Sequence, residues 1–154
     1  MQIRIRNVTN EDLDDFVEIY REAYRGLEEY AYTRTRDIKS YFRWLMNRDR
    51  DGFFVAEIDD KPVGFVACDT NWISVFENEK VGEIHEIFVH PKWQGKGIGS
   101  ALLLRALDYA RSKGRRLAEL WVGVGNLKAK RFYEKFGFEE SGSWGRWIRM
   151  IREI

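Results

Sequence analysis

The residues best suited to chemistry lie within 83–100, a stretch that reads EIHEIFVHPKWQGKGIGS. Gly95, Gly97 and Gly99 stand at alternate positions at the start of a segment whose apolar residues have helical spacing. Glycine permits positive φ and close backbone approach, and the first turn of a helix carries unpaired N–H donors. Such a loop can hold an anion, most naturally a phosphate or pyrophosphate. Lys96 adds a positive charge beside it.

The spacing of these glycines excludes two common phosphate-binding motifs. No window of the sequence contains the GxxxxGK[ST] of a P-loop, and the glycines read GxGxG instead of the GxGxxG of a dinucleotide fingerprint. The preceding strand also lies far into the chain, whereas a dinucleotide fold carries its fingerprint after the first strand. The pattern that fits is Q-x-x-G-x-G, formed by Gln94, Gly97 and Gly99. It resembles the pyrophosphate motif [RQ]-x-x-G-x-[GA] of the GNAT superfamily of N-acetyltransferases.

A second motif strengthens this resemblance. Residues 126–138, NLKAKRFYEKFGF, are similar to the later GNAT motif N-x-x-A-x-x-x-Y-E-K-x-G-F. One predicted helix and one predicted strand separate the two motifs, as in the family. Close matching is confined to 83–138, whereas the order of elements agrees over most of the chain. The residues in register with the later motif are Asn126, Ala129, Tyr133, Glu134, Lys135, Gly137 and Phe138.

The resemblance implies that acetyl-CoA is the co-substrate and that no metal is used. In the family, the glycine loop grips the pyrophosphate, and a β-bulge splays the fourth strand from the fifth, which leaves backbone free for pantetheine. That backbone corresponds to 87–89, with the Val89 N–H placed to stabilise an oxyanion. An ordinary tight strand-to-helix turn is the alternative for the loop. The expected cofactor contacts are Ile87, Phe88, Val89, Gln94, Gly95, Lys96, Gly97, Ile98, Gly99, Ser100, Asn126 and Tyr133.

Direct transfer of the acetyl group needs a neutral amine, yet a lysine-like amine has a pKa of about 10.4 and is mostly protonated at neutral pH. A carboxylate or imidazole can accept that proton, directly or through water. The candidates are Glu83, Glu86 and His85, and the resemblance favours them in that order. Strand alternation would place Glu83 and His85 on one face and Glu86 on the other, unless a bulge intervenes. Each could instead be a solvated or salt-bridged side chain.

Two residues of the later motif allow both a functional and a structural interpretation. By resemblance, Tyr133 is the general acid toward the departing thiolate, whereas its helical position also suits an amphipathic core tyrosine. Asn126 would bond the pantetheine amide, and the role of a helix N-cap alone would also explain it.

Apolar periodicity predicts the elements that position these residues. Strands are expected at 2–8, 53–58, 62–69, 83–90, 116–122, 138–140 and 144–151, with a turn region over 72–80. Helices are expected from a cap at Thr9 or Asn10 to a break at Gly26, and over about 37–47, 97–112 and 126–136. This order indicates an α/β (α+β) mixed sheet. The resemblance implies the GNAT-like acyl-CoA N-acyltransferase fold, a central, mostly antiparallel sheet with helices on both faces.

Composition narrows the class of protein. The 154 residues are 44% hydrophobic and 33% charged, which predicts one globular domain over 1–154. The resemblance implies that this is a single N-acetyltransferase domain. A net charge of +1 gives no reason to expect a nucleic-acid or membrane partner, and no apolar run is long enough to span a bilayer. The single cysteine, Cys68, excludes an internal disulfide and favours a cytoplasmic location. Lys92, Trp93 and Lys96 are better explained by the 3′-phosphate and adenine of CoA than by nucleic acid.

The motifs do not identify the amine acceptor. Tyr24, Tyr30 and Tyr32, with Glu28 and Glu29, either line a cleft for a cationic amine or are core tyrosines beside a solvated acidic face. Protein N-termini, lysines and small molecules all stay open as acceptors, and a homodimer is plausible. The alternative function is a non-catalytic acyl-CoA-binding regulatory module of the same fold. The glycine spacing disfavours a third candidate, a nucleotide-binding oxidoreductase.

Overall fold

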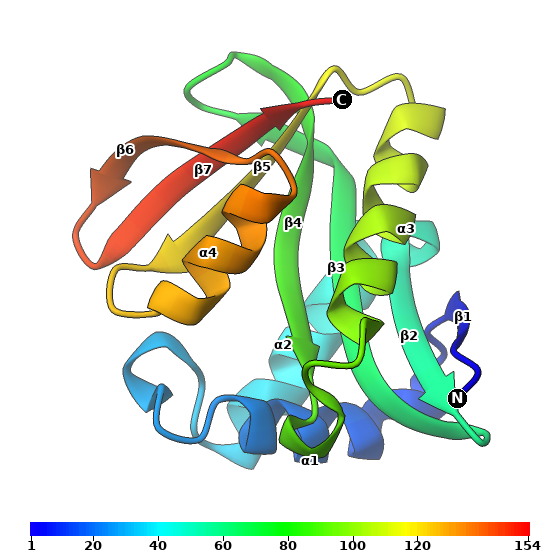
Figure 1. Ribbon diagram of the computed structural model, residues 1–154. Helices are drawn as coiled ribbons and strands as arrows, with labels where there is room; N and C mark the ends of the chain where they lie inside the picture. Colours follow the sequence, from blue (N-terminus) through cyan, green and yellow to red (C-terminus); the bar gives the residue numbers. More distant parts are fainter.

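The computed structural model covers residues 1–154 and contains one seven-stranded sheet of order β1-β2-β3-β4-β5-β7-β6 (Figure 1). All neighbouring strands are antiparallel except β4 and β5. The strands are β1 (Arg4–Asn7), β2 (Phe53–Ile58), β3 (Lys61–Ser74), β4 (Glu79–Val89), β5 (Leu117–Gly123), β6 (Glu139–Trp144) and β7 (Trp147–Glu153). The helices are α1 (Leu13–Ala23), α2 (Thr35–Arg48), α3 (Ile98–Ser112) and α4 (Leu127–Lys135). The predicted mixed, mostly antiparallel sheet is therefore confirmed.

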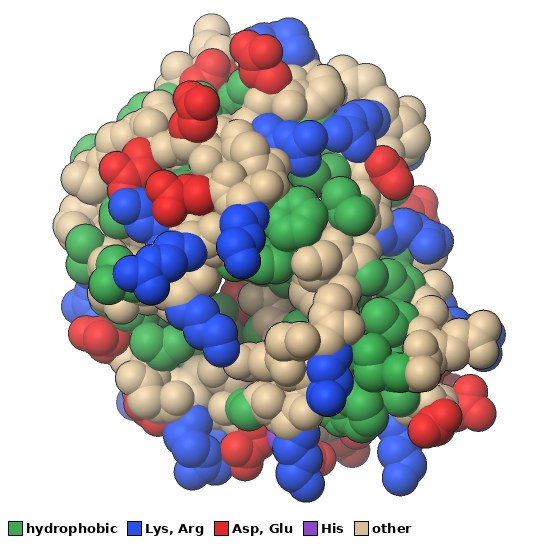
Figure 2. All heavy atoms as spheres, in the orientation of Figure 1, with side chains coloured by type: hydrophobic (Ala, Val, Ile, Leu, Met, Phe, Trp, Pro, Cys, Tyr) green, Lys and Arg blue, Asp and Glu red, His purple; other side chains and the backbone are tan.

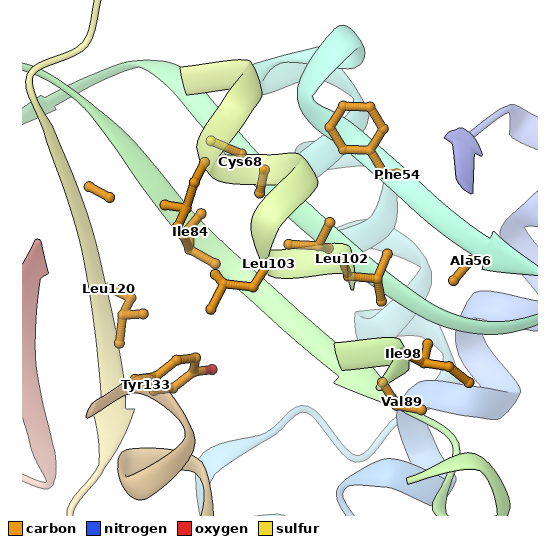
Figure 3. Close-up of a cluster of buried hydrophobic side chains, with 14 of the residues drawn as sticks. Phe54, Ala56, Cys68, Ile84, Val89, Ile98, Leu102, Leu103, Leu120 and Tyr133 are labelled. Carbon is orange, nitrogen blue, oxygen red and sulfur yellow. The ribbon is translucent and has the colours of Figure 1, made fainter. Parts of the chain in front are cut away.

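The helices cover the two faces of the sheet in pairs, and each pair encloses a hydrophobic core. Helices α3 and α4 pack over one face, where Leu102 and Leu103 of α3 are fully buried (Figure 3). Helices α1 and α2 pack over the other face, around a group of aromatic rings centred on Phe16. Alternate residues of β2 divide between the cores: Phe53 and Val55 face α1 and α2, and Phe54 faces α3.

The ends of several elements differ from the predicted bounds. The turn region expected over 72–80 is wrong, because β3 continues to Ser74 and β4 begins at Glu79, which leaves a turn of only 75–78. This hairpin contains many polar residues, so its sequence lacks the pattern expected of strands. The two strands pair through backbone hydrogen bonds, which do not depend on that pattern. The first helix is preceded by a 3-10 turn, Asn10–Asp12, with Thr9 in a capping box. No helix of the structure is both long and apolar enough to cross a membrane.

The strand β4 leaves its neighbour β5 soon after they meet. The two pair in parallel only at 82–84, so the rest of β4 has no strand beside it on that edge. On the other edge, Cys68 of β3 pairs with Ile84 and Ala67 pairs with Glu86, which leaves His85 as an extra, bulged residue. The bulge and the divergence together open the sheet in front of the acids of β4.

Candidate active site

The main cleft lies where β4 and β5 diverge. It has a volume of about 1770 Å³, and β4, the glycine loop, α4, the segment between α1 and α2, and the ends of β5 and β7 line it. Figure 2 shows a deep hollow near the centre of this face, with Lys and Arg side chains around its edge. Both sequence motifs contribute to the walls, so the cleft joins an anion-binding loop to the acids of β4.

The glycine loop leads from the free end of β4 into α3. Gly95 and Gly97 have φ values of 76° and 84°, a conformation that strongly favours glycine, and the space beside each is open. Gln94 fixes the loop, because its Nε2 donates a hydrogen bond to the Val89 carbonyl at 3.0 Å. Lys128 of α4 donates in turn to Gln94 Oε1, also at 3.0 Å. The loop and α4 therefore form one continuous polar wall.

Not every residue of the first motif presents its side chain to the cleft. Ile98 is buried in the core, so only its backbone is available to a ligand. Lys96 and Lys92 are exposed and do not line the cleft. The basic side chains that do line it beside the loop come from α4, namely Lys128, Arg131 and Lys135.

The later motif forms the opposite wall. Asn126 caps α4, since its side-chain oxygen accepts a hydrogen bond from the Ala129 N–H at 3.4 Å. Tyr133 is buried, and its hydroxyl points away from Leu120 of β5 and toward β4 (Figure 3). Burial raises the pKa of Tyr133, and the nearby charge of Glu86 raises it further. The phenol is thus held protonated, facing the cleft that Glu86 also lines.

Glu86 occupies the floor of the cleft between two tyrosines. The Tyr24 hydroxyl donates to Oε1 at 2.5 Å, and the Tyr41 hydroxyl lies 3.5 Å from Oε2. Burial raises the pKa of Glu86 to about 8, although both tyrosine hydrogen bonds act in the opposite direction. A carboxyl with this pKa exchanges protons near neutral pH, as a general base must.

Glu83 belongs to a buried polar network. Its carboxyl hydrogen-bonds to that of Glu119, whose Oε2 also accepts from Ser74 at 2.9 Å and from Arg149 at 2.5 Å. The other oxygen of Glu83 is buried without a partner. Burial and the Glu119 carboxylate raise the pKa of Glu83 well above its usual value, and bonds to Glu83, Ser74 and Arg149 lower that of Glu119. The pair therefore holds one proton, on Glu83.

The His85 ring lies against Trp44 of α2, with the ring centroids 4.8 Å apart. Its Nε2 lies 2.8 Å from Asp69 Oδ2, which also accepts a hydrogen bond from Arg48 of α2 at 2.6 Å. Because His85 is the bulged residue, His85 and Glu86 both project from the sheet face that α1 and α2 cover. The alternation expected in the absence of a bulge therefore does not apply, and Glu86 lies on the same face as His85.

Comparison with known proteins identifies the family. The model of the Acetyltransferase (GNAT) family matches residues 13–138, which is most of the chain. The chain belongs to the GNAT family. An uncharacterized N-acetyltransferase of Methanocaldococcus jannaschii is 56% identical over 150 residues, 97% of this chain and 66% of that protein. Another, from Archaeoglobus fulgidus, is 61% identical over 131 residues, 85% of this chain and 89% of that protein.

Solved structures agree with this assignment. The crystal structure of PH1933 from Pyrococcus horikoshii OT3 superimposes with a TM-score of 0.91 and 42% sequence identity, over 99% of each chain. The GNAT-like fold and the class of acetyl-CoA-dependent acyltransferases, both recognised from the two motifs, are confirmed. The chain spans only about two thirds of the Methanocaldococcus relative.

One of the two interpretations of the segment after α1 places its tyrosines and acids in a cleft. Tyr24, Glu29, Tyr30 and Tyr32 do line the cleft, whereas Glu28 bonds the Gly26 N–H. The spacing of Tyr41 predicts only a core position, yet its hydroxyl reaches the floor of the cleft. The tyrosines that follow α1 were the usable signal, since a phenol combines an apolar ring with a hydrogen-bonding tip.

Proposed function

We propose that residues 1–154 form a single N-acetyltransferase domain that transfers the acetyl group of acetyl-CoA directly to a primary amine. One observation carries the proposal: the unpaired edge of β4 connects the glycine loop to Glu86, an acid with a pKa of about 8. A cofactor held along this edge would present its reactive end to a base that is matched to proton transfer near neutral pH.

The residues of the chain fit acetyl-CoA, which supplies an acetyl thioester. The open positive-φ positions Gly95 and Gly97 and the first turn of α3 offer N–H groups to a pyrophosphate. Lys128, Arg131 and Lys135 supply positive charge for the phosphates, in place of Lys92 and Lys96. The backbone of 87–89 borders the cleft for the pantetheine arm.

The structure favours Glu86 over Glu83 as the base. Both acids line the cleft, but the Glu83 carboxyl is engaged with Glu119 and its other oxygen is buried, so Glu83 is less available to an amine than Glu86 is. Glu86 lines the open cleft and is partly accessible. In this assignment Glu86 accepts the proton of the amine, and the protonated Glu83–Glu119 pair supports the fold beside it.

Tyr133 is proposed as the general acid. Its phenol keeps its proton because burial and the charge of Glu86 raise its pKa. Placed on the α4 wall, it can donate a hydrogen bond to the thiolate as that group departs. Asn126 faces the same cleft and can bond the pantetheine while it caps α4.

The proposed acceptor is an amine of a small molecule or a protein. The proposed location of the enzyme is cytoplasmic, and it forms a homodimer or acts as a monomer. The alternative, a non-catalytic acyl-CoA-binding module, is not favoured, because such a module needs neither a base matched to neutral pH nor a phenol facing it. Trp144 and Trp147 at the edge of the cleft suit contacts to an acceptor.

Two measurements test the proposal. Calorimetric titration should show micromolar binding of acetyl-CoA and none of NAD or ATP. Thiol release with a panel of amines should then fall about 100-fold or more in Glu86→Gln, because a general base contributes 10²–10⁴-fold. Glu83→Gln keeps a donor for Glu119 and should stay within a few-fold of wild type. Equal losses in the two variants would reject Glu86 as the base, and no acetyl-CoA binding would reject the activity.

A further inference from the structure

A second hollow lies against α2, on the far side of Tyr41 from the glycine loop. It has a volume of about 530 Å³, and most of its lining side chains are aromatic rings. Two of these rings are large and exposed, with Tyr32 at 50% and Trp44 at 42%. The full lining is Tyr32, Asp37, Ser40, Tyr41, Trp44 and His85.

The rings form a connected series around this aromatic hollow. Tyr32 and Tyr41 have centroids 5.1 Å apart, Tyr41 and Trp44 lie nearly parallel at 6.2 Å, and Trp44 meets His85 edge-on at 4.8 Å. Trp72, next to His85, already has the Arg48 guanidinium over its ring at 5.4 Å. No cation of the chain lies over Tyr32, Tyr41 or Trp44. The exposed rings of Tyr32 and Trp44 therefore carry no cation of this chain and can accept one from a ligand.

The charge at this hollow also favours a cation. Asp37 lines it, and its only cationic neighbours are Arg34 at 4.0 Å and Arg36 at 3.9 Å, both strongly exposed. Exposed pairs at such distances contribute little, so Asp37 is available to another cation. Asp69, behind His85, is already bonded to Arg48 and His85. A weakly paired carboxylate beside rings that carry no cation of the chain can bind an ammonium group.

The aromatic hollow connects to the proposed site of reaction through shared walls. Tyr32, Tyr41 and His85 line both hollows. The Tyr41 hydroxyl donates to the His85 carbonyl at 3.2 Å and lies 3.5 Å from Glu86 Oε2. The Tyr41 side chain thus lies between the proposed base and the rings, so an acceptor that reaches both must pass beside it.

We propose that the aromatic hollow binds a second cationic group of the acceptor, so that the preferred acceptor is a small aliphatic diamine. One amine then lies at Glu86 for acetylation, and the other, still protonated, lies over Trp44 and Tyr32 near Asp37. This inference rests on the proposed function for its catalytic half. The cation site itself depends only on the geometry of the hollow.

Binding of tetramethylammonium tests the cation site without catalysis, because this ion has no N–H to acetylate. Titration followed by NMR should shift the Trp44 indole resonance, whereas tert-butanol, a neutral molecule of similar shape, should not. In Trp44→Leu the affinity should fall about fivefold or more, and in Asp37→Asn it should also fall. Asp108→Asn removes an exposed carboxylate from α3 and is the matched control. Equal responses to the ion and to tert-butanol would overturn the site.

Steady-state kinetics tests the acceptor. The value of kcat/KM for diaminopentane should exceed that for pentylamine about tenfold, since about 1.4 kcal/mol corresponds to a factor of ten. Trp44→Leu and Asp37→Asn should remove this advantage and leave pentylamine unchanged. Equal values for the two amines in wild type would overturn the inference while the proposed function stands. If no amine were acetylated, the proposed function would fail, and the tetramethylammonium titration would still decide the cation site.

Discussion

The Tyr24 hydroxyl lies 2.5 Å from Glu86 Oε1 and joins the residue after α1 to the bulged part of β4. This bond opposes the effect of burial, because a donated hydrogen bond stabilises the ionised carboxylate. The pKa of about 8 for Glu86 is the balance of the two effects. Tyr24 is thus one of two tyrosines that lower the pH at which the proposed base becomes available.

Removing this hydroxyl should move the pH profile. Tyr24→Phe leaves burial in place and loses a bond to a charged group, so the pKa of Glu86 should rise. A bond to a charged group contributes about 1.5–3 kcal/mol, which corresponds to an upward move of about one to two pH units in the midpoint at which kcat/KM rises with pH. At neutral pH kcat/KM should fall about 10- to 100-fold and recover at higher pH.

A pH series of kcat/KM checks this expectation, with Tyr109→Phe as the control. Tyr109 also donates to a carboxylate, Asp49 at 2.5 Å, but does not line the cleft. Its loss should leave the midpoint unchanged. A midpoint that stays fixed or moves down in Tyr24→Phe would show that Glu86 does not control the profile.

Tyr133→Phe should separate turnover from cofactor binding. The ring fills the same space against Phe138, and only the hydroxyl facing the cleft is lost. We expect kcat to fall about 10²-fold, within the range for a general acid, while the calorimetric affinity for acetyl-CoA stays within a few-fold. An unchanged kcat at saturating substrates would remove Tyr133 from the mechanism, and a parallel loss of affinity would make it a binding residue.

The local features of this site could be predicted from the sequence, because they depend only on residues that are close together in the chain. Gly95 and Gly97 take positive φ, and Asn126 caps its helix, as their types and positions indicate. The features that depend on a partner strand could not. His85 is a bulge only because of the register between β3 and β4, and no alternation within β4 reveals an extra residue.

The choice between Glu83 and Glu86 depends on the same kind of non-local information. Glu83 lies in the part of β4 that pairs with β5, directly beside Glu119, whereas Glu86 lies beyond it. The sequence contains both acids but not the point at which the strands separate. Long-range pairing thus decides which of the two cleft acids is buried in a network and which one stays partly accessible.

The Glu83–Glu119 pair should make stability depend on pH. The pKa of Glu83 is raised on folding, so the native state holds its proton more tightly than the unfolded chain, and stability is lost as pH rises above the unfolded value of about 4.3. Glu83→Gln removes this loss. The melting temperature of the variant minus that of wild type should increase by several degrees as pH rises from about 5 to about 9.

Thermal unfolding across this pH range provides the measurement, with Glu18→Gln, an exposed acid on α1, as the control. The control should follow wild type at every pH. If the melting temperature of Glu83→Gln minus that of wild type decreased as pH rises, Glu83 would be ionised in the native protein. The assignment of the shared proton would then be wrong.

Tyr30 crosses the end of β5 and fixes a wall of the cleft. Its hydroxyl accepts a hydrogen bond from the Gly125 N–H at 2.8 Å, its ring packs on Trp147 at 5.5 Å, and a Cβ at Gly123 would meet that ring at 2.6 Å. Gly123→Ala should therefore displace Tyr30, destabilise the protein by about 1–3 kcal/mol and raise KM for the acceptor several-fold. KM for acetyl-CoA should change little, because the glycine loop lies elsewhere in the cleft.

A double-mutant cycle isolates the contact behind this prediction. In the Tyr30→Ala background the obstructing ring is absent, so Gly123→Ala should cost almost nothing further in denaturant unfolding. Val124→Ala, at an exposed neighbouring position outside the cleft, should leave both KM values unchanged. If Gly123→Ala cost as much without the Tyr30 ring as with it, the destabilisation would arise from the β5 backbone, and Tyr30 would not be the element that closes the acceptor side of the cleft.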